Sequence, residues 1–347
     1  MDKVTISCPL PITKQETITL AHGSGGKLMH NLIDDVILSV LKNRYLDGNS
    51  DSAVIELGTS KLAFTTDSYV VNPIFFPGGD IGTLAVNGTV NDLAMSGAKP
   101  LYLSVGLILE EGFPIESLKR IMGSMNVAAK YSGITLVTGD TKVVDKGKGD
   151  GIFINTAGIG VVEHNLNISP YEVKDGDVII LNGELGEHGI AIMAVRENLS
   201  FESNIKSDTA PLVEIVNKII KTNATIHCFR DLTRGGLGSA LNEIAEAANV
   251  SIEIYEENIP VRKDVQGACE ILGLDPIYIA NEGKFITIVP EKDAEKTLEV
   301  MKKDKEGKNA KVIGKVKKGD SIVSMKTTFG TNRIIDMLTG EQLPRIC

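Results

Sequence analysis

Three aspartates stand where short apolar runs begin or end, and together with a fourth on a helix they could bind a cation. Asp67 ends the run LAFTTD, Asp140 ends LVTGD, and Asp51 comes just before AVIEL. Carboxylates that converge at one sheet edge repel each other and need a cation. Mg²⁺ prefers oxygen ligands and usually bridges to phosphates. With Asp92 from the neighbouring helix, the pattern predicts a magnesium–nucleotide site. Independent aspartates in turns are the alternative.

The stretch PGGDIGTLAVNGTVNDLAMSGAKP predicts a helix that is buried on nearly every side. Asp80 is a good N-cap, and Gly97 is typical of a helix C-terminus. Asn87, Asn91 and Asp92 interrupt this apolar helix, and buried polar groups are costly without partners. They indicate either an internal hydrogen-bond network or a binding site.

The stretch AHGSGGKLMHNLI places a glycine-rich loop before a helix. It is not a Walker A loop, because the spacing differs and no Ser or Thr follows Lys27. Gly23, Gly25 and Gly26 could still bring backbone N–H groups against a phosphate. A flexible N-terminal turn is the alternative.

Two stretches in the second half are further candidates. RDLTRGGLGSALNE puts Asp231 or Thr233 at a helix start, with Arg230 and Arg234 close by, and could bind an anion. In IYIANEGKF, Glu282 lies in a polar cluster between apolar residues. The cluster indicates a site or a tight turn.

The cysteines and histidines are scattered, which argues against a zinc site. Cys228 and Cys269 lie in apolar surroundings and are expected to be small buried residues. His188, at a Gly-flanked turn, could cap a helix or touch substrate. Cys347 ends the chain in EQLPRIC, where a thiol is mobile and exposed unless something holds it.

Composition points to a cytoplasmic enzyme or binding protein. The net charge of -9 argues against nucleic-acid binding. We find no signal peptide and no apolar run of membrane-spanning length. Strand and helix patterns alternate in both halves, which predicts an α/β protein with a domain boundary in EHNLNISPYEVKDGD. The expected parts are an N-terminal extension (1–17), a first domain (18–163), a second domain (164–335) and a flexible tail (336–347).

Five motifs together resemble the HypE family of hydrogenase maturation factors, over residues 18–347. They are TTDSYVVNPIFFPGGDIGTLAVNGTVNDLAMSGAKP, GDTKVV, RDLTRGG, DPIYIANEGK and the ending LPRIC. The aspartates and the Asn–Asp helix are shared across the superfamily of aminoimidazole ribonucleotide and selenophosphate synthetases. The terminal PRIC is more specific. Leu232 stands where the family usually has proline, and residues 1–17 are an extension; neither departure touches a proposed site residue.

The resemblance implies a PurM-like fold of two α/β domains, with a homodimer formed through first-domain strands and ATP and Mg²⁺ bound near that interface. It implies that the carbamoyltransferase HypF loads a carbamoyl group onto Cys347. ATP-dependent dehydration then gives a thiocyanate, whose cyanide passes to iron on the HypC–HypD complex for [NiFe]-hydrogenase. No nucleic-acid or membrane partner is implied.

Residue roles follow from motif position. We expect Lys142 near the transferred phosphate and Glu282 as the base that removes amide protons. The cofactor-binding set is Gly23, Gly25, Gly26, Lys27, Thr66, Asp67, Asp80, Asn91, Asp92, Gly139 and Asp140, and the metal ligands are Asp51, Asp67, Asp92 and Asp140. Two alternatives remain: a related ATP-using enzyme acting on a free small molecule, and a non-catalytic thiol carrier or metallochaperone.

Overall fold

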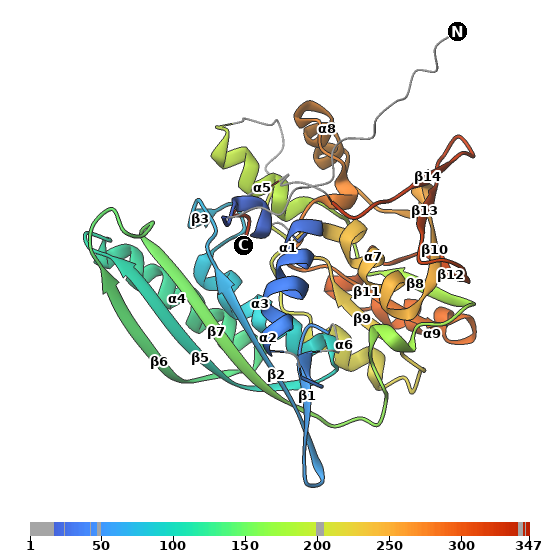
Figure 1. The fold of residues 1–347 in the computed structure, drawn as a ribbon, viewed down its shortest axis with the longest axis horizontal. Helices are drawn as coiled ribbons and strands as arrows, with labels where there is room; N and C mark the ends of the chain where they lie inside the picture. The colour runs from blue at the N-terminus through green and yellow to red at the C-terminus, as the bar shows by residue number, and fades with distance from the viewer. Residues whose placement is uncertain are drawn as a thin grey trace.

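The computed structural model describes residues 17–23, 25–41, 43–46, 50–198, 205–338, 343 and 345–347. Cys8, the first sixteen residues of the expected extension, and parts of the expected tail (339–342 and 344) lie outside the described residues. Two sheets, one in each half of the chain, form the body of the molecule (Figure 1). In the part described, no helix has the length and apolar character needed to cross a bilayer.

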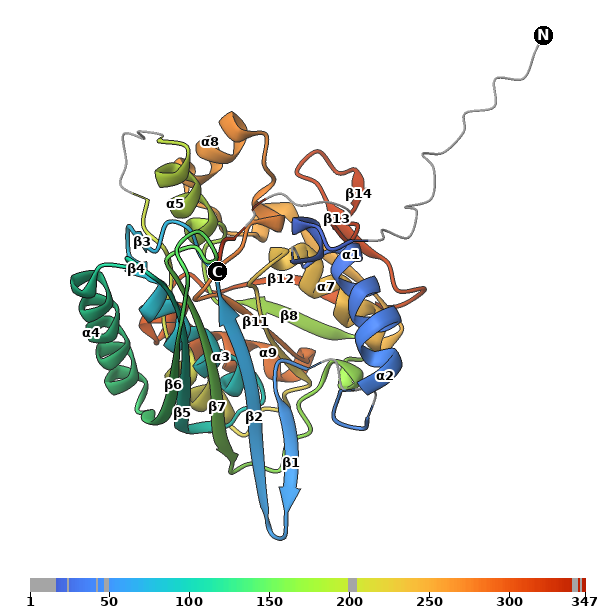
Figure 2. The same cartoon turned by 60° about the vertical axis from the view of Figure 1, so that its left-hand side comes forward.

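The first sheet has five strands, and helices cover one of its faces (Figure 2). The strands, in spatial order, are β1 (Ala53–Leu57), β2 (Ser60–Tyr69), β7 (Ile152–Val162), β5 (Lys99–Glu110) and β6 (Thr135–Val144). All neighbours pair antiparallel except β5 and β6. The other elements of this half are α1 (Lys27–Leu32), a π-helical segment (Ile33–Leu38), α2 (Ser39–Leu41), β3 (Phe75–Phe76), β4 (Gly79–Asp80), α3 (Ile81–Met95) and α4 (Ile115–Ser132).

Helix α3 confirms the predicted buried helix. The carboxylate of Asp80 accepts a hydrogen bond from Thr83 N at 2.9 Å, and Gly97 has a φ of 70° just beyond the helix. Its apolar side chains pack with β2, β5, β7 and α4 into the first core, while Ala94 and Met95 join a core of the second half. The helix is apolar on all sides because it packs against both halves of the molecule.

The second sheet has seven strands and is covered by helices on both faces. In spatial order they are β14 (Asn332–Ile334), β13 (Val323–Lys326), β10 (Val250–Tyr255), β12 (Lys311–Lys318), β8 (Asp177–Leu181), β11 (Phe285–Pro290) and β9 (Cys228–Asp231). The helices are α5 (Glu187–Arg196), α6 (Val213–Ile220), α7 (Gly236–Ala248), α8 (Lys263–Leu272) and α9 (Glu291–Lys302). Short 3₁₀ turns occur at Leu20–Gly23, Pro170–Glu172, Glu256–Asn258, Pro276–Tyr278 and Lys305–Gly307.

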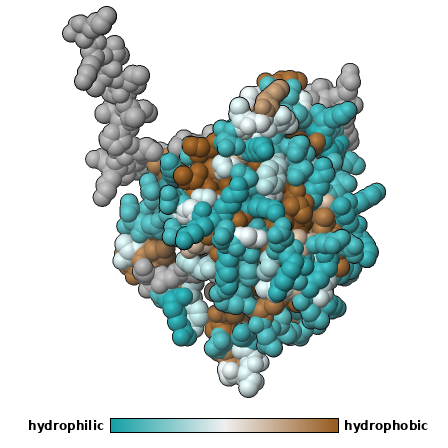
Figure 3. All heavy atoms as spheres, turned by 90° about the vertical axis from the view of Figure 1, so that its right-hand side faces the viewer, coloured by the Kyte–Doolittle hydropathy of each residue, from teal (hydrophilic) through white to brown (hydrophobic). Residues whose placement is uncertain are grey.

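Strand β8 explains why both faces need helices. All five of its residues are buried. Ile179 and Leu181 belong to the core under α7, whereas Val178 and Ile180 belong to the core under α6 and α9. Successive strand residues point to opposite faces, so a continuous apolar run requires cover on both. The side of the molecule that carries β13 and β14 is mostly hydrophilic (Figure 3). The predicted α/β class with two domains is confirmed.

Candidate active site

Three of the four predicted metal-site aspartates, Asp51, Asp67 and Asp92, come together, and Asp231 joins them. These four residues form the acidic cluster. Asp92 on α3 accepts a hydrogen bond from Thr65 Oγ1 at 2.9 Å. Burial raises the pKa of Asp92 well above its usual range, and the nearby charges of Asp231, Asp67 and Asp51 raise it further. Several negative charges in one buried place favour a cation there. Among the described residues, however, no three side chains form a ready-made metal-binding group.

Asp231 is the cluster member that the sequence analysis did not include. Burial, followed by the charge of Asp51, raises its pKa well above the usual range. It was expected as a possible helix start, but the N-cap of α7 is Gly235, with a φ of 79°. Asp231 is instead the last residue of β9. Asp67 and Asp140 were expected to end their strands, but this was wrong: β2 continues to Tyr69 and β6 to Val144, because the polar and small residues that follow still pair in the sheet.

A pocket of about 210 Å³ opens beside the cluster, between α1 and the second domain. It is lined by Gly25, Met29, His30, Ile33, Asp51, Arg230, Asp231, Thr233, Arg234, Gly236, Ala240 and Glu243. Its walls combine carboxylates with two arginines, which suits a metal-bound anion.

Asp140 does not join this cluster in the single chain. It lies on β6, the edge strand, and its side chain is 69% exposed in a salt bridge with Lys142 Nζ at 2.6 Å. The bridge and backbone contacts lower the pKa of Asp140. Two strands, β7 and β5, stand between β2 and β6, so Asp140 is roughly 14 Å across the sheet from Asp67 at the usual strand spacing. Gly139 precedes it and packs closely on Val105 O.

Two predicted cofactor residues have structural partners instead. Asp80 is buried, and it caps α3 and also accepts a hydrogen bond from Ser124. Asn91 donates to Ala210 O at 3.0 Å and accepts from Leu212 N at 2.8 Å, so it joins the two domains. For Asn91, the alternative of an internal hydrogen-bond network describes the structure. The predicted N-cap role of Asp80 is confirmed, and both of its carboxylate oxygens accept hydrogen bonds from the protein; its role in cofactor binding stays a prediction.

Thr66 lies next to Asp67 but on the other face of the sheet. Its hydroxyl donates to Thr156 O at 3.0 Å, and the residue is exposed. Because neighbouring strand residues alternate between faces, Asp67 lies with Thr65 on the face toward α3 and Thr66 lies on the open face.

The glycine-rich loop lies beside the cluster and is packed against protein backbone. Arg234 donates to Gly23 O at 3.0 Å, and Lys27 N donates to Leu338 O at 2.8 Å. A Cβ on Gly25 or Gly26 would come within 2.9 Å of Arg234 O or 2.4 Å of Leu338 O. The glycines thus permit close backbone approach. Among the residues predicted to bind the cofactor, Lys27 already donates its backbone N–H to a protein carbonyl.

The end of the chain is docked rather than free. Val70 N donates to Cys347 O at 3.0 Å, and Arg345 Nε donates to Val70 O at 3.0 Å. Ile346 is only 2% exposed. His188 Nε2 donates to Ile346 O at 2.8 Å. His188 therefore holds the tail, and it does not cap α5, whose N-cap is Gly186. In Figure 2 the chain end lies at the end of β2.

Cys347 lies among the charged groups of the site. Burial raises the pKa of its thiol to about 12; Arg234 acts against this, whereas Glu282, Asp67 and Asp231 add to it. The thiol is therefore protonated at neutral pH. Cys228 and Cys269 are buried and unpaired, as expected.

Glu282 is buried beside the tail with an unpartnered oxygen. It is 3% exposed, and its Oε1 has no hydrogen-bond partner among the described residues. Burial, then the charges of Asp67 and Asp208, raise its pKa well above the usual range, whereas Arg234 lowers it. A carboxyl group with a pKa raised toward neutrality suits proton transfer.

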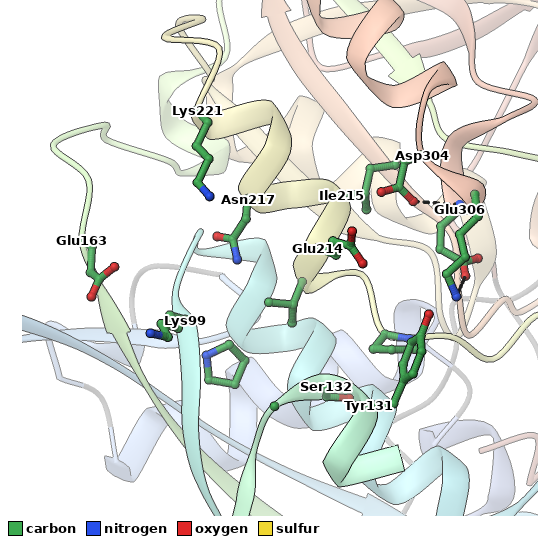
Figure 4. A pocket seen from close by; sticks show the side chains of 15 residues that line it. Lys99, Tyr131, Ser132, Glu163, Glu214, Ile215, Asn217, Lys221, Asp304 and Glu306 are labelled. Carbon is green, nitrogen blue, oxygen red and sulfur yellow. Dashed lines mark hydrogen bonds and ion pairs between the residues drawn. The ribbon is translucent and has the colours of Figure 1, made fainter. Parts of the chain in front are cut away.

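A separate pocket of about 430 Å³ lies at the seam between the domains (Figure 4). It is lined by the start of β5 and the end of α4 on one side and by α6 and Asp304–Glu306 on the other. Lys305 Nζ lies 4.5 Å from the Tyr131 ring centroid, a contact that bridges the seam. None of the acidic-cluster residues lines this pocket.

Comparisons with known proteins identify relatives over nearly the whole chain. Residues 49–162 match the N-terminal domain of the AIR synthase related proteins, and residues 174–326 match the C-terminal domain. The chain is 49% identical to carbamoyl dehydratase HypE of Azotobacter vinelandii, over 95% of this chain and 97% of that protein. A crystal structure of a HypE–HypF complex aligns with a TM-score of 0.85 and 47% identity, over 88% of this chain and 99% of that one. A crystal structure of HypE in complex with ATP aligns with a TM-score of 0.81 and 46% identity, over 95% of this chain and 100% of that one.

Proposed function

Because the chain belongs to the HypE family of carbamoyl dehydratases, we propose that it dehydrates an S-carboxamide on its own Cys347 to a thiocyanate, using ATP. The position of Cys347 carries this proposal. The last residue lies beside Arg234, Glu282 and the acidic cluster, so a group attached to its sulfur starts next to the site. Tethering makes the reaction intramolecular, which favours correct orientation.

The reaction removes one oxygen and two protons from the carboxamide. ATP, when bound, supplies the phosphoryl group that turns the amide oxygen into a phosphate leaving group. Glu282 accepts a proton from the amide nitrogen as the C–N multiple bond forms. Arg234 offsets negative charge beside the sulfur-bound carbon. The carboxamide oxygen leaves within the phosphate; one amide proton ends on that phosphate and the other passes through Glu282 to solvent. The products are the S-cyanide, ADP, hydrogen phosphate and one proton.

The acidic cluster has the oxygen-donor chemistry that suits a magnesium ion, although its described side chains do not already converge as a three-ligand group. Asp51, Asp67, Asp92 and Asp231 offer hard oxygen ligands. The charges of the other three raise the pKa of Asp92, so they repel in the absence of a cation. Magnesium would neutralise phosphate charge during transfer. Asp140 is not close enough to contribute from the same chain.

A homodimer is part of the proposal. Phe64, Ile159 and Tyr102 are paired neighbours across β2, β7 and β5 on the face away from α3, and are 42%, 38% and 50% exposed. Lys142 pairs with Ile108 on this open face. A second copy packed there would cover the apolar row and bring its own Asp140 and Lys142 toward the site.

The proposed partners follow from the relatives. The solved HypE–HypF complex supports HypF as the enzyme that carbamoylates Cys347. The HypC–HypD complex would receive the cyanide on iron. In this proposal the reaction takes place in the cytoplasm.

Mass analysis of the intact protein tests the function. After incubation with HypF, carbamoyl phosphate and Mg–ATP, the C-terminal peptide should gain one carbamoyl group and then lose one water. Cys347→Ser should abolish both changes, whereas Cys269→Ser, at a buried cysteine far along the chain, should retain them. An unchanged Cys347 peptide in the wild type would refute the proposal. An enzyme acting on a free small molecule would keep its turnover in Cys347→Ser.

A further inference from the structure

Four charged side chains form a continuous chain from helix α1 to the acidic cluster. His30 Nε2 lies 3.1 Å from Glu243 Oε1, and Arg230 Nη2 contacts Glu243 Oε2. Arg230 Nη1 then lies 3.2 Å from Asp51 Oδ1. The side chains of Glu243, Arg230 and Asp51 are 13%, 14% and 13% exposed, and that of His30 is 32% exposed. These groups belong to α1, α7, β9 and the residues before β1.

Arg230 is held at two points of one planar group. Its guanidinium is a rigid fork, so fixing Nη2 on Glu243 also fixes the direction of Nη1 toward Asp51. Glu243 lies in the 13-residue helix α7, whose backbone hydrogen bonds fix its position. Asp51 precedes β1; its backbone carbonyl accepts a hydrogen bond from Thr65 Oγ1 at 3.0 Å, and its carboxylate lies against Arg230. Glu243 is thus placed to act on the Asp51 carboxylate through Arg230, without a hydrogen bond or salt bridge of its own to Asp51.

The sharing of Arg230 also matters for a metal. An arginine paired only with Asp51 would compete with a cation for that carboxylate. Glu243 takes part of the guanidinium charge and leaves Asp51 less fully neutralised. Both carboxylate oxygens of Glu243 are used, one by Arg230 and one by His30.

We propose that Glu243 and His30 are positioning residues for the metal–nucleotide site: Glu243 orients Arg230 on Asp51, and His30 ties this arrangement to helix α1. The inference rests on the proposed magnesium site. It makes the N-terminal helix part of the nucleotide-binding machinery through side chains rather than through its glycine-rich loop. These residues line the 210 Å³ pocket, so the chain forms one wall of that space.

Glu243→Gln in the full-length protein provides the test. Outer-sphere partners of metal ligands usually contribute about 10- to 100-fold to metal affinity or activity. We expect Kd for magnesium with a non-hydrolysable ATP analogue, and KM for Mg–ATP, to rise about 10-fold or more, while kcat changes less than about 3-fold. Glu295→Gln, which removes the same charge from the exposed side of α9, should leave both values unchanged.

A double-mutant cycle separates positioning from a general loss of structure. The fold-increases in Kd caused by Asp51→Asn and Glu243→Gln should not multiply in the double variant, because both substitutions act through Asp51. His30→Gln, at a more exposed residue, should raise Kd by about 3-fold and provides a readout if Glu243→Gln fails to fold.

Three results would overturn the inference. An unchanged Kd in both Glu243→Gln and His30→Gln would show that neither residue positions the site. Fully multiplicative effects in the cycle would show that Glu243 acts independently of Asp51. A Kd that Asp51→Asn leaves unchanged would refute the magnesium site itself, and the inference with it.

Discussion

Asp67 on β2 and Asp140 on β6 look alike in sequence but differ in their surroundings. Each follows an apolar run in the sequence, and each lies inside a strand of the same sheet. Asp67 lies near Asp92, Asp231 and Glu282, and its charge raises the pKa of all three. Asp140 is exposed and paired with Lys142. The difference arises from strand order and from the face each residue occupies.

The comparison separates two kinds of site residue. The cluster around Asp67 gathers several carboxylates within one chain, and Arg230 forms a salt bridge with one of them, Asp51. The Asp140–Lys142 pair on β6 is exposed and carries no net charge as a pair. In the proposed dimer this pair would approach the site of the other subunit. The first should respond to metal and nucleotide, and the second to dimerisation.

Removing the candidate base should have the largest effect. Glu282→Gln keeps the size of the side chain but cannot accept a proton, so dehydration should slow by about 10²- to 10⁴-fold, measured by mass analysis of the carbamoylated tail. Nucleotide binding should persist. Because burial raises the pKa of Glu282, the wild-type rate should rise with pH up to that pKa.

Glu116→Gln, on the exposed first turn of α4, is the matched control and should keep the wild-type rate. If the Glu282→Gln variant dehydrated the carbamoylated tail at the wild-type rate, Glu282 would not be the base.

Replacing Asp92 by a neutral residue should lower the activity and raise the stability of the metal-free protein. Asp92→Asn should lower the dehydration rate by about 10²- to 10³-fold, the scale of losing one electrostatic contact to the transition state. The raised pKa of Asp92 means that the metal-free fold loses stability as pH rises from the ordinary carboxyl value toward the folded value. The variant should avoid this loss and melt roughly 2–4 °C higher at neutral pH without metal, as about 1 kcal/mol would produce.

Asp140→Asn is the companion measurement, because its carboxylate is exposed and already paired. It should leave the metal-free melting temperature unchanged. A lower melting temperature in Asp92→Asn would contradict the idea that the charge of Asp92 destabilises the metal-free fold.

Mixing two inactive variants tests whether the β6 pair serves the other subunit. Lys142→Ala and Glu282→Gln should each be impaired alone. After mixing and exchange, activity should recover to about a quarter of wild type, since half of randomly paired dimers are mixed and one of their two sites is intact. No recovery, despite proven subunit exchange, would place Lys142 in the site of its own chain.

The smallest expected effect concerns the docked tail. His188→Gln weakens the hydrogen bond to Ile346 O, and one such bond contributes about 0.5–1.5 kcal/mol. Carboxypeptidase should then release Cys347 about 2- to 10-fold faster. His164→Gln, which weakens a similar bond to Ser96 O away from the tail, should not change the rate. Equal rates for all three proteins would mean that His188 does not hold the tail.

The predictable parts of the site were those with local signals. Asp51, Asp67 and Asp92 could be named because polar residues interrupt apolar runs. Asp231 carried the same signal, yet it was assigned to a helix start because glycines and arginines follow it. Glu243 had no local signal, since a glutamate on an amphipathic helix is ordinary. Its partners, Arg230 and His30, come from distant segments.

The sequence by itself determined the elements: a capped helix that must be buried on every side, strands that need cover on one or two faces, and a thiol at the last residue. The physical reason is that capping, periodicity and burial cost act over a few neighbouring residues. Only the tertiary structure decided which carboxylates meet, that Asp140 faces the open side, and that Cys347 docks against Val70. Those outcomes depend on strand order and on packing between segments far apart in the chain.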